Sequence, residues 1–126
     1  MKSTILYVED NSDIRDITSV ILTKAGYNVI TSPNGKDGLD LCKKQHFDMI
    51  VTDILMPVMD GNEFIKKVSG LKYVPPIVAL SYRDSDVAPN HHITTVALKP
   101  LTSRELVQTI NAAFTKNQAK LEMGAA

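Results

Sequence analysis

Short, continuously apolar segments alternate with longer amphipathic ones along this chain, and the alternation constrains its fold more than any other feature. The apolar segments are rich in β-branched residues and do not alternate with polar ones, which is typical of strands buried on both faces. Five such strands are predicted, at residues 4–8, 27–31, 48–52, 77–80 and 94–98. The sequence therefore predicts an α/β fold: a doubly wound, five-stranded parallel sheet with helices on both faces.

The amphipathic stretches between these strands carry start and stop signals of helices. Ser12 with Asp13 is predicted to cap the first helix, which ends just before Gly26. Its predicted core face is apolar and consists of Ile14, Ile17, Ile21 and Leu22. Near the end of the chain, Thr102 and Glu105 have the spacing of a capping box at the start of the last helix.

The segment Arg83–His92, between the fourth and fifth strands, has too few apolar residues for a stable helix. Only Val87 and Ala88 are apolar before Pro89, and proline blocks the propagation of a helix. We therefore expect the fourth helix of this fold to be short or disordered.

The length and composition set further bounds. With 126 residues the chain is long enough for one domain, expected at residues 1–115, followed by a helical extension or flexible tail at 116–126. Lys plus Arg equals Asp plus Glu at 14 each, so charge gives no reason to expect nucleic-acid or membrane binding. The single cysteine, Cys42, excludes an internal disulfide and is interpreted as a small core residue. We expect a cytoplasmic protein.

Polar side chains follow the predicted strands, at the edge where an open parallel sheet binds its ligands. They comprise three carboxylates, a hydroxyl and an ammonium: Glu9, Asp10, Asp53, Ser81 and Lys99. Two carboxylates ~4 Å apart repel by roughly 4 kcal/mol at an effective dielectric constant of about 20, so this cluster requires cations. Oxygen ligands of this kind favour Mg²⁺. A carboxylate beside such a metal and a lysine can accept a phosphoryl group.

Together these residues give the chain a resemblance to the receiver domain of response regulators, the CheY-like family of two-component signalling. The resemblance extends from about Ser3 to Phe114, and its motifs are Val8–Asn11, Asp53–Gly61, Ser81 and Lys99-Pro100. It implies the strand order 2-1-3-4-5, which flavodoxin and CheY share.

The resemblance also implies a role for each residue at the predicted edge. Asp53 would be the phosphoacceptor, Ser81 the switch hydroxyl, and Lys99 the partner of the phosphoryl oxygens. Four oxygen donors would hold Mg²⁺: Glu9, Asp10, Asp53 and the backbone carbonyl of Leu55. The Lys99-Pro100 peptide bond would be cis, as proline permits.

The implied partners are proteins. A sensor histidine kinase or a histidine phosphotransfer protein would donate the phosphoryl group from a phosphohistidine, and a downstream protein would bind the switched surface. Neither nucleic acid nor a membrane would be a direct partner. The domain would catalyse only its own phosphorylation and slow dephosphorylation, without being an enzyme that turns over a substrate.

Two positions depart from the family pattern. Val96 occupies the site of the family's aromatic switch residue, so the usual coupled motion of hydroxyl and ring cannot operate. Tyr82 follows the switch hydroxyl, where a small residue is usual, and its ring could shield the acceptor. An alternative hypothesis is therefore a pseudo-receiver that acts only as a protein-binding module. A flavin-binding flavodoxin is disfavoured, because Glu9 and Asp10 would repel the flavin phosphate.

Overall fold

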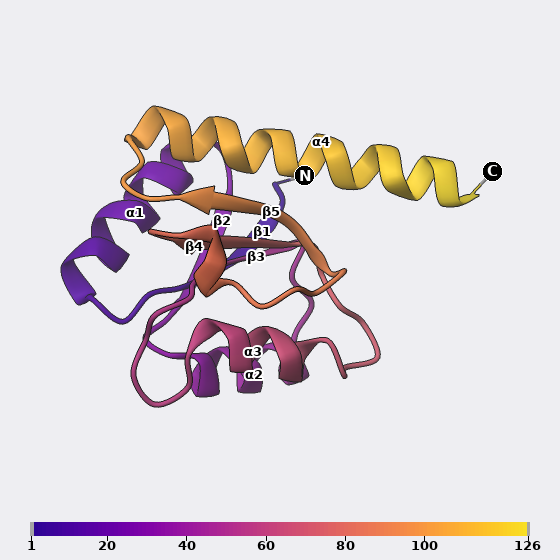
Figure 1. The fold of residues 1–126 in the computed structure, drawn as a ribbon. Helices are drawn as coiled ribbons and strands as arrows, with labels where there is room; N and C mark the ends of the chain where they lie inside the picture. The colour runs from indigo at the N-terminus through magenta and orange to yellow at the C-terminus, as the bar shows by residue number, and fades with distance from the viewer. Residues whose placement is uncertain (1, 126) are drawn as a thin grey trace.

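Five parallel strands form a single sheet in the computed structural model, which describes residues 2–125 (Figure 1). The strands are β1 (Thr4–Val8), β2 (Asn28–Ser32), β3 (Met49–Asp53), β4 (Ile77–Ser81) and β5 (Ile93–Leu98). Their order across the sheet is β2-β1-β3-β4-β5, which confirms the predicted 2-1-3-4-5 order. The central strands β3 and β4 are buried along their whole length, as expected for strands that are apolar until their carboxyl ends.

Helices cover both faces of the sheet. They are α1 (Ser12–Lys24), α2 (Gly35–Lys44), α3 (Gly61–Val68) and α4 (Ser103–Ala125). In Figure 1, α1 and α4 lie on one face of the sheet, and α2 and α3 lie on the other. The fold is therefore the predicted doubly wound α/β arrangement, with a separate apolar core on each face of the sheet.

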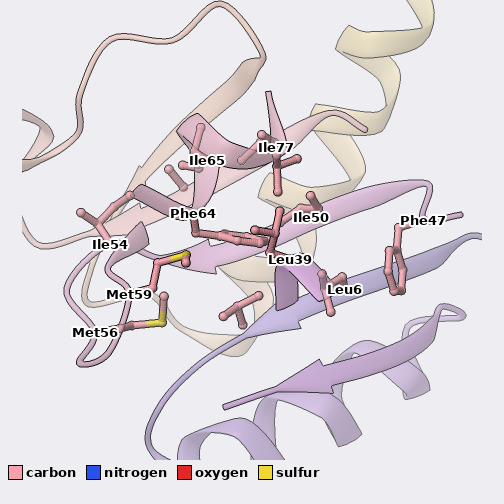
Figure 2. Close-up of a cluster of buried hydrophobic side chains, with 13 residues drawn as sticks. Leu6, Leu39, Phe47, Ile50, Ile54, Met56, Met59, Phe64, Ile65 and Ile77 are labelled. Atoms are coloured by element: carbon pink, nitrogen blue, oxygen red, sulfur yellow. The ribbon is translucent and has the colours of Figure 1, made fainter. Parts of the chain in front are cut away.

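The core beneath α2 and α3 supports the loop that follows β3. Figure 2 shows Phe64 of α3 packed among the aliphatic side chains of this core, with Met56 and Met59 reaching in from the loop. Asp60 caps α3, because its side chain accepts a hydrogen bond from the Glu63 amide at 2.9 Å. The buried methionines thus anchor the loop to the core, and the cap at Asp60 fixes the point where the loop enters α3.

The last helix, α4, begins with the predicted capping box. The Glu105 amide donates to the Thr102 hydroxyl, and the Thr102 amide donates to the Glu105 carboxylate, both at 3.1 Å. The helix buries Leu106 and Ile110 against the sheet and then extends past it (Figure 1). It remains helical to Ala125, while residue 126, the end of the predicted tail, lies outside the described residues. The boundary between residues 115 and 116 stays a prediction.

The predicted cap of α1 is wrong, and its predicted core face is confirmed at Leu22 but wrong at Ile14 and Ile17. Ile14 and Ile17 are 50% and 62% exposed, whereas Thr18 and Leu22 are buried. The cap is Asn11, whose side chain accepts a hydrogen bond from the Ile14 amide at 3.0 Å. Two neighbouring stripes of this helix can face a sheet, and the apolar periodicity alone does not determine which one turns inward.

The helix expected between β4 and β5 is reduced to a single turn, as the sequence predicted. Between β4 and β5 the structure has only a 3₁₀ turn, Asp84–Asp86. The face of β5 that a longer helix would cover is left open, and Val96 and Leu98 are exposed there.

Candidate functional site

Three carboxylates meet at the carboxyl edge of the sheet. Glu9 and Asp10 follow β1 directly, Asp53 is the last residue of β3, and the register aligns the two strand ends by pairing Val8 with Thr52. One carboxylate oxygen from each side chain lies within 4.8 Å of the others. Glu9 and Asp53 are buried, whereas Asp10 is exposed. The structure thus brings together the three carboxylates that the sequence predicted.

Lys99 neutralises part of this charge. Its Nζ lies 2.7 Å from Asp53 Oδ1. The lysine can reach the carboxylate because β5 ends beside β4, where the Lys99 amide donates to the Ser81 carbonyl at 2.7 Å. Burial raises the pKa of the Asp53 carboxyl, and the hydrogen bond and charge of Lys99 lower it only in part. Additional positive charge would therefore favour the ionised, nucleophilic form of Asp53.

Glu9 has an oxygen that the protein leaves unpaired. The residue is 3% exposed, and its Oε2 has no hydrogen-bond partner among the described residues 2–125. A buried carboxylate oxygen without a donor is unfavourable, and a bound cation relieves that penalty. Hard oxygen donors in this number suit Mg²⁺, which retains several waters. The residues present therefore fit a Mg²⁺ ion.

Leu55 lies two residues beyond Asp53, in the loop that leads to α3. Its side chain is exposed, so the residue is not held there by core packing. A part for its backbone carbonyl in metal binding remains a prediction from the family resemblance.

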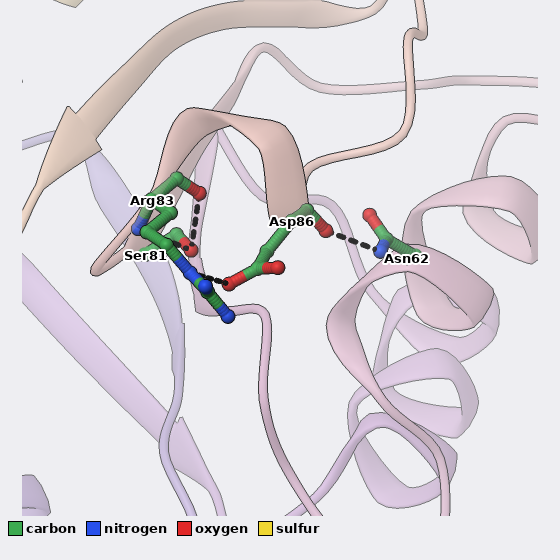
Figure 3. Close-up of polar contacts among 4 residues, drawn as sticks. All are labelled: Asn62, Ser81, Arg83 and Asp86. Carbon is green, nitrogen blue, oxygen red and sulfur yellow. Dashed lines mark hydrogen bonds and ion pairs between the residues drawn. The ribbon is translucent and has the colours of Figure 1, made fainter.

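Ser81 is buried at the end of β4, one residue past Leu80, which pairs with Asp53 across the sheet. Its hydroxyl donates to the Arg83 carbonyl at 2.8 Å, so it is engaged by its own loop (Figure 3). A new acceptor on Asp53 would compete with this bond for the same proton.

The loop after Ser81 is tied to α3 through contacts that the sequence did not reveal. Arg83 Nε lies 3.3 Å from Asp86 Oδ2. The Asn62 side chain donates to the Asp86 carbonyl at 2.8 Å (Figure 3). It also accepts from the Ala88 amide at 2.9 Å. An asparagine in the first turn of a helix gives no sequence signal for a partner 24 residues away. These contacts connect the loop that follows Ser81 to α3.

Tyr82 and Val96 flank the site differently. Tyr82 is 63% exposed, and its ring centroid lies 5.0 Å from Lys99 Nζ. Tyr82 and Lys99 line a cavity of about 130 Å³ that is also lined by Glu9 and Asp53. Val96 lies on β5 opposite Ala79, so the fifth strand presents methyl groups at the position where the resemblance predicts an aromatic ring.

The predicted cis peptide bond between Lys99 and Pro100 is present, which confirms that expectation. It follows β5 directly, at the residue whose ammonium contacts Asp53.

Comparisons with known proteins place this chain among related sequences and folds. A family model described as "Response regulator receiver domain" matches residues 5–111. The chain is similar to the chemotaxis response regulator CheY4 of Vibrio cholerae, with 31% identity and a TM-score of 0.78 over 90% of this chain and 99% of that one. It shares the fold of the receiver domain of the sensor histidine kinase PA1611 from Pseudomonas aeruginosa PAO1, with 23% identity and a TM-score of 0.83 over 91% of this chain and 99% of that one. That structure is described with a magnesium ion coordinated in the active-site cleft.

A curated relative is longer than this chain. The "Uncharacterized transcriptional regulatory protein YkoG" of Bacillus subtilis (strain 168) is 30% identical over 129 residues, which cover 96% of this chain. The match spans only 55% of YkoG, so the similarity concerns one part of that protein. Among the described residues of this chain, no helix combines the length and the apolar character needed to cross a membrane.

Proposed function

This chain belongs to the response regulator receiver domain family, and from that membership we propose that it accepts a phosphoryl group on Asp53 from a phosphohistidine. The observation that carries the proposal is the 2.7 Å contact between Lys99 Nζ and Asp53 Oδ1, beside two further carboxylates. Asp53 is the buried carboxylate that contacts the ammonium, so it is the candidate nucleophile.

The proposed reaction is a transfer between two protein side chains. A carboxylate oxygen of Asp53 attacks phosphorus and forms a P–O bond, while the P–N bond of the phosphohistidine breaks. The imidazole nitrogen leaves with the electron pair of that bond and takes up a proton from solvent. The Lys99 ammonium offsets the negative charge on the phosphoryl oxygens. In the slow dephosphorylation, water attacks the phosphorus and the P–O bond to Asp53 breaks. Inorganic phosphate leaves, and the Asp53 carboxylate is restored.

Four donors would hold Mg²⁺ in this proposal: Glu9, Asp10, Asp53 and the backbone carbonyl of Leu55. When bound, the ion would supply positive charge next to the phosphoryl oxygens. The unpaired buried oxygen of Glu9 supports this ion, and so does the magnesium described in the PA1611 receiver domain.

Intact-protein mass spectrometry tests the proposal. The chain is incubated with Mg²⁺ and a small phosphodonor such as acetyl phosphate, and we expect one added phosphoryl mass. Asp53→Asn keeps the size of the side chain but removes the nucleophilic oxygen, so that mass should be lost. Asp40→Asn, on the exposed face of α2, is the matched control and should behave like the parent. An unmodified parent, or an Asp53→Asn variant modified at the parental rate, would overturn the proposal.

The proposed partners follow from this reaction. The donor would be a sensor histidine kinase or a histidine phosphotransfer protein, and the recipient of the switched surface would be another protein. The balanced charge of the chain, 14 basic against 14 acidic residues, supports protein partners over nucleic acid. A lone thiol suits the reducing cytoplasm, which is the compartment we propose.

Two observations favour a second candidate, a pseudo-receiver that only binds protein. Val96 has no aromatic ring that could move as the family's switch residue does. The segment between β4 and β5 forms only a single 3₁₀ turn in place of a helix. Phosphorylation of Asp53 without any change at the loop between β4 and β5 would favour this alternative. A phosphorylation-dependent change in that loop would exclude it.

A further inference from the structure

We propose that Tyr82 is a positioning residue for Lys99, holding its ammonium group in place above Asp53 through the face of the aromatic ring. The inference rests on the proposed phosphorylation of Asp53 and assigns Tyr82 a part in it. Tyr82 itself would touch neither the phosphoryl group nor the metal.

The ends of two neighbouring strands place these side chains together. Ser81 of β4 pairs with Leu98 of β5, and the Lys99 amide donates to the Ser81 carbonyl at 2.7 Å. The residues that follow, Tyr82 and Lys99, therefore leave the sheet side by side. Lys99 Nζ lies 5.0 Å from the centre of the Tyr82 ring and 2.7 Å from Asp53 Oδ1. One ammonium group thus contacts a ring and a carboxylate at once.

Core packing does not explain the position of the Tyr82 ring. Tyr82 is 63% exposed, and it borders the same small cavity as Glu9, Asp53 and Lys99. An ammonium within about 6 Å of an aromatic centroid is attracted to the negative face of the ring. The partner that this position offers Tyr82 is therefore the charge of Lys99.

A lysine needs such help more than an arginine would. Its ammonium is a point charge on a flexible chain of four carbons, so many orientations compete with the one that faces Asp53. The ring face restricts these orientations but has no directional acceptor. The ammonium can therefore turn from the carboxylate toward a phosphoryl oxygen on Asp53 while it keeps the ring contact. The Lys99 ammonium is therefore already oriented before the phosphodonor binds, so less conformational entropy is lost during the transfer.

The rival role for Tyr82 is shielding, in which the ring blocks access to Asp53. The two roles predict opposite effects of removing the ring. Loss of positioning slows phosphorylation at saturating donor, whereas loss of a shield speeds it.

The test compares two variants of Tyr82 with a matched control. Tyr82→Leu keeps an apolar side chain without a ring, and Tyr82→Phe keeps the ring without the hydroxyl. Tyr73→Leu is the control, since Tyr73 is another half-exposed tyrosine and stacks on His46, away from the site. We expect Tyr82→Leu to lower the maximal rate with acetyl phosphate and Mg²⁺ by about two- to fivefold, the value of an exposed cation–π contact. The half-saturating donor concentration should not change, and Tyr82→Phe should restore the rate.

A second readout does not depend on phosphorylation. Protons on the Lys99 carbon next to Nζ, held over a ring face, should show an upfield ring-current shift in the NMR spectrum of the parent. Tyr82→Phe should keep this shift, and Tyr82→Leu should lose it.

The outcomes separate the two proposals. A parent that is never phosphorylated overturns the proposed function and the role of Tyr82 with it. A phosphorylated parent whose maximal rate and Lys99 shift match those of Tyr82→Leu overturns the role of Tyr82 alone. A faster Tyr82→Leu shows that the ring is a shield, and a Tyr82→Phe variant as slow as Tyr82→Leu shows that the hydroxyl matters; either result also overturns positioning.

Discussion

Gly61, the first residue of α3, lies directly against the backbone of Asp53. A Cβ on Gly61 would lie 2.2 Å from the Asp53 carbonyl oxygen and 2.7 Å from the Ile54 Cα. The Gly61 amide donates to the Ile54 carbonyl at 2.7 Å, so the contact is also a hydrogen-bonded one. The start of α3 is therefore built onto the end of the strand that carries the candidate phosphoacceptor.

Gly61→Ala should strongly destabilise the protein. The atoms that the new methyl group meets are backbone atoms of Asp53 and Ile54, which cannot move aside as a flexible side chain does. Overpacking of this kind costs about 1–3 kcal/mol and sometimes more. Gly70→Ala is the matched control, because its Cβ would meet only the Lys67 carbonyl, at 3.5 Å. Urea unfolding of both variants checks the prediction, and equal midpoints would contradict it.

Asn62→Ala should loosen the loop between β4 and β5. Asn62 satisfies two backbone groups there, the Asp86 carbonyl and the Ala88 amide. Each such bond contributes about 0.5–1.5 kcal/mol, so the loop should open more often when both are lost. Hydrogen exchange of the Ala88 amide should become faster in Asn62→Ala. Asn28→Ala, at the exposed start of β2, should leave that amide unchanged, and unaltered exchange in Asn62→Ala would show that the clamp is unimportant.

The sequence predicted which side chains lie close together at the carboxyl edge of the sheet, because parallel strands bring their carboxyl ends to one edge. Glu9, Asp53 and Lys99 could be placed there from strand ends alone, since register then fixes their proximity. The contact between Tyr82 and Lys99 could not be predicted, because it depends on side-chain directions after the strands end. The inward face of α1 was predicted only in part for a similar reason: Leu22 faces the core as expected, but Thr18 joins it there in place of Ile14 and Ile17. Rotation of a helix depends on what packs against it.

Mg²⁺ should stabilise the folded protein, because the buried Glu9 oxygen and the clustered carboxylates attract a cation only when the chain is folded. At ten times the dissociation constant, mass action gives about 1.4 kcal/mol. For a domain of this size that corresponds to a rise of roughly 3–8 °C in melting temperature. Asp10→Ala should abolish the rise, whereas Asp40→Asn should keep it. A parent whose melting temperature ignores millimolar Mg²⁺ would count against the metal site.

Cys42 should react slowly with iodoacetamide. Burial raises the pKa of its thiol to about 11, and the thiolate is the reactive form. At pH 8 only about one thiol in a thousand is then ionised, and this fraction rises about tenfold for each pH unit up to pH 10. Alkylation of the folded protein should follow the same slope. The urea-unfolded chain is the control and should react far faster at pH 8, and equal rates in the two states would show that Cys42 is accessible.

Switching should depend on Ser81 and not on Val96. The Ser81 hydroxyl donates to the Arg83 carbonyl, a neutral bond that contributes about 0.5–1.5 kcal/mol, whereas a bond to a charged phosphoryl oxygen contributes about 1.5–3 kcal/mol. The exchange is therefore favourable, and it should pull the loop at residues 82–92 away from its resting contacts. Val96 has only methyl groups and a stiff χ1, so it cannot swing as a ring does.

The test for the switch uses the beryllofluoride complex of Asp53, a stable mimic of the acyl phosphate, with amide chemical shifts as the readout. Ser81→Ala should blunt the shift changes at residues 82–92 that the parent shows when the mimic binds. Val96→Ala should retain them and mainly lower the unfolding free energy, because a partly exposed packing contact is lost. A full response in Ser81→Ala, or a missing response in a well-folded Val96→Ala, would reverse the assignment of the switch to the serine hydroxyl.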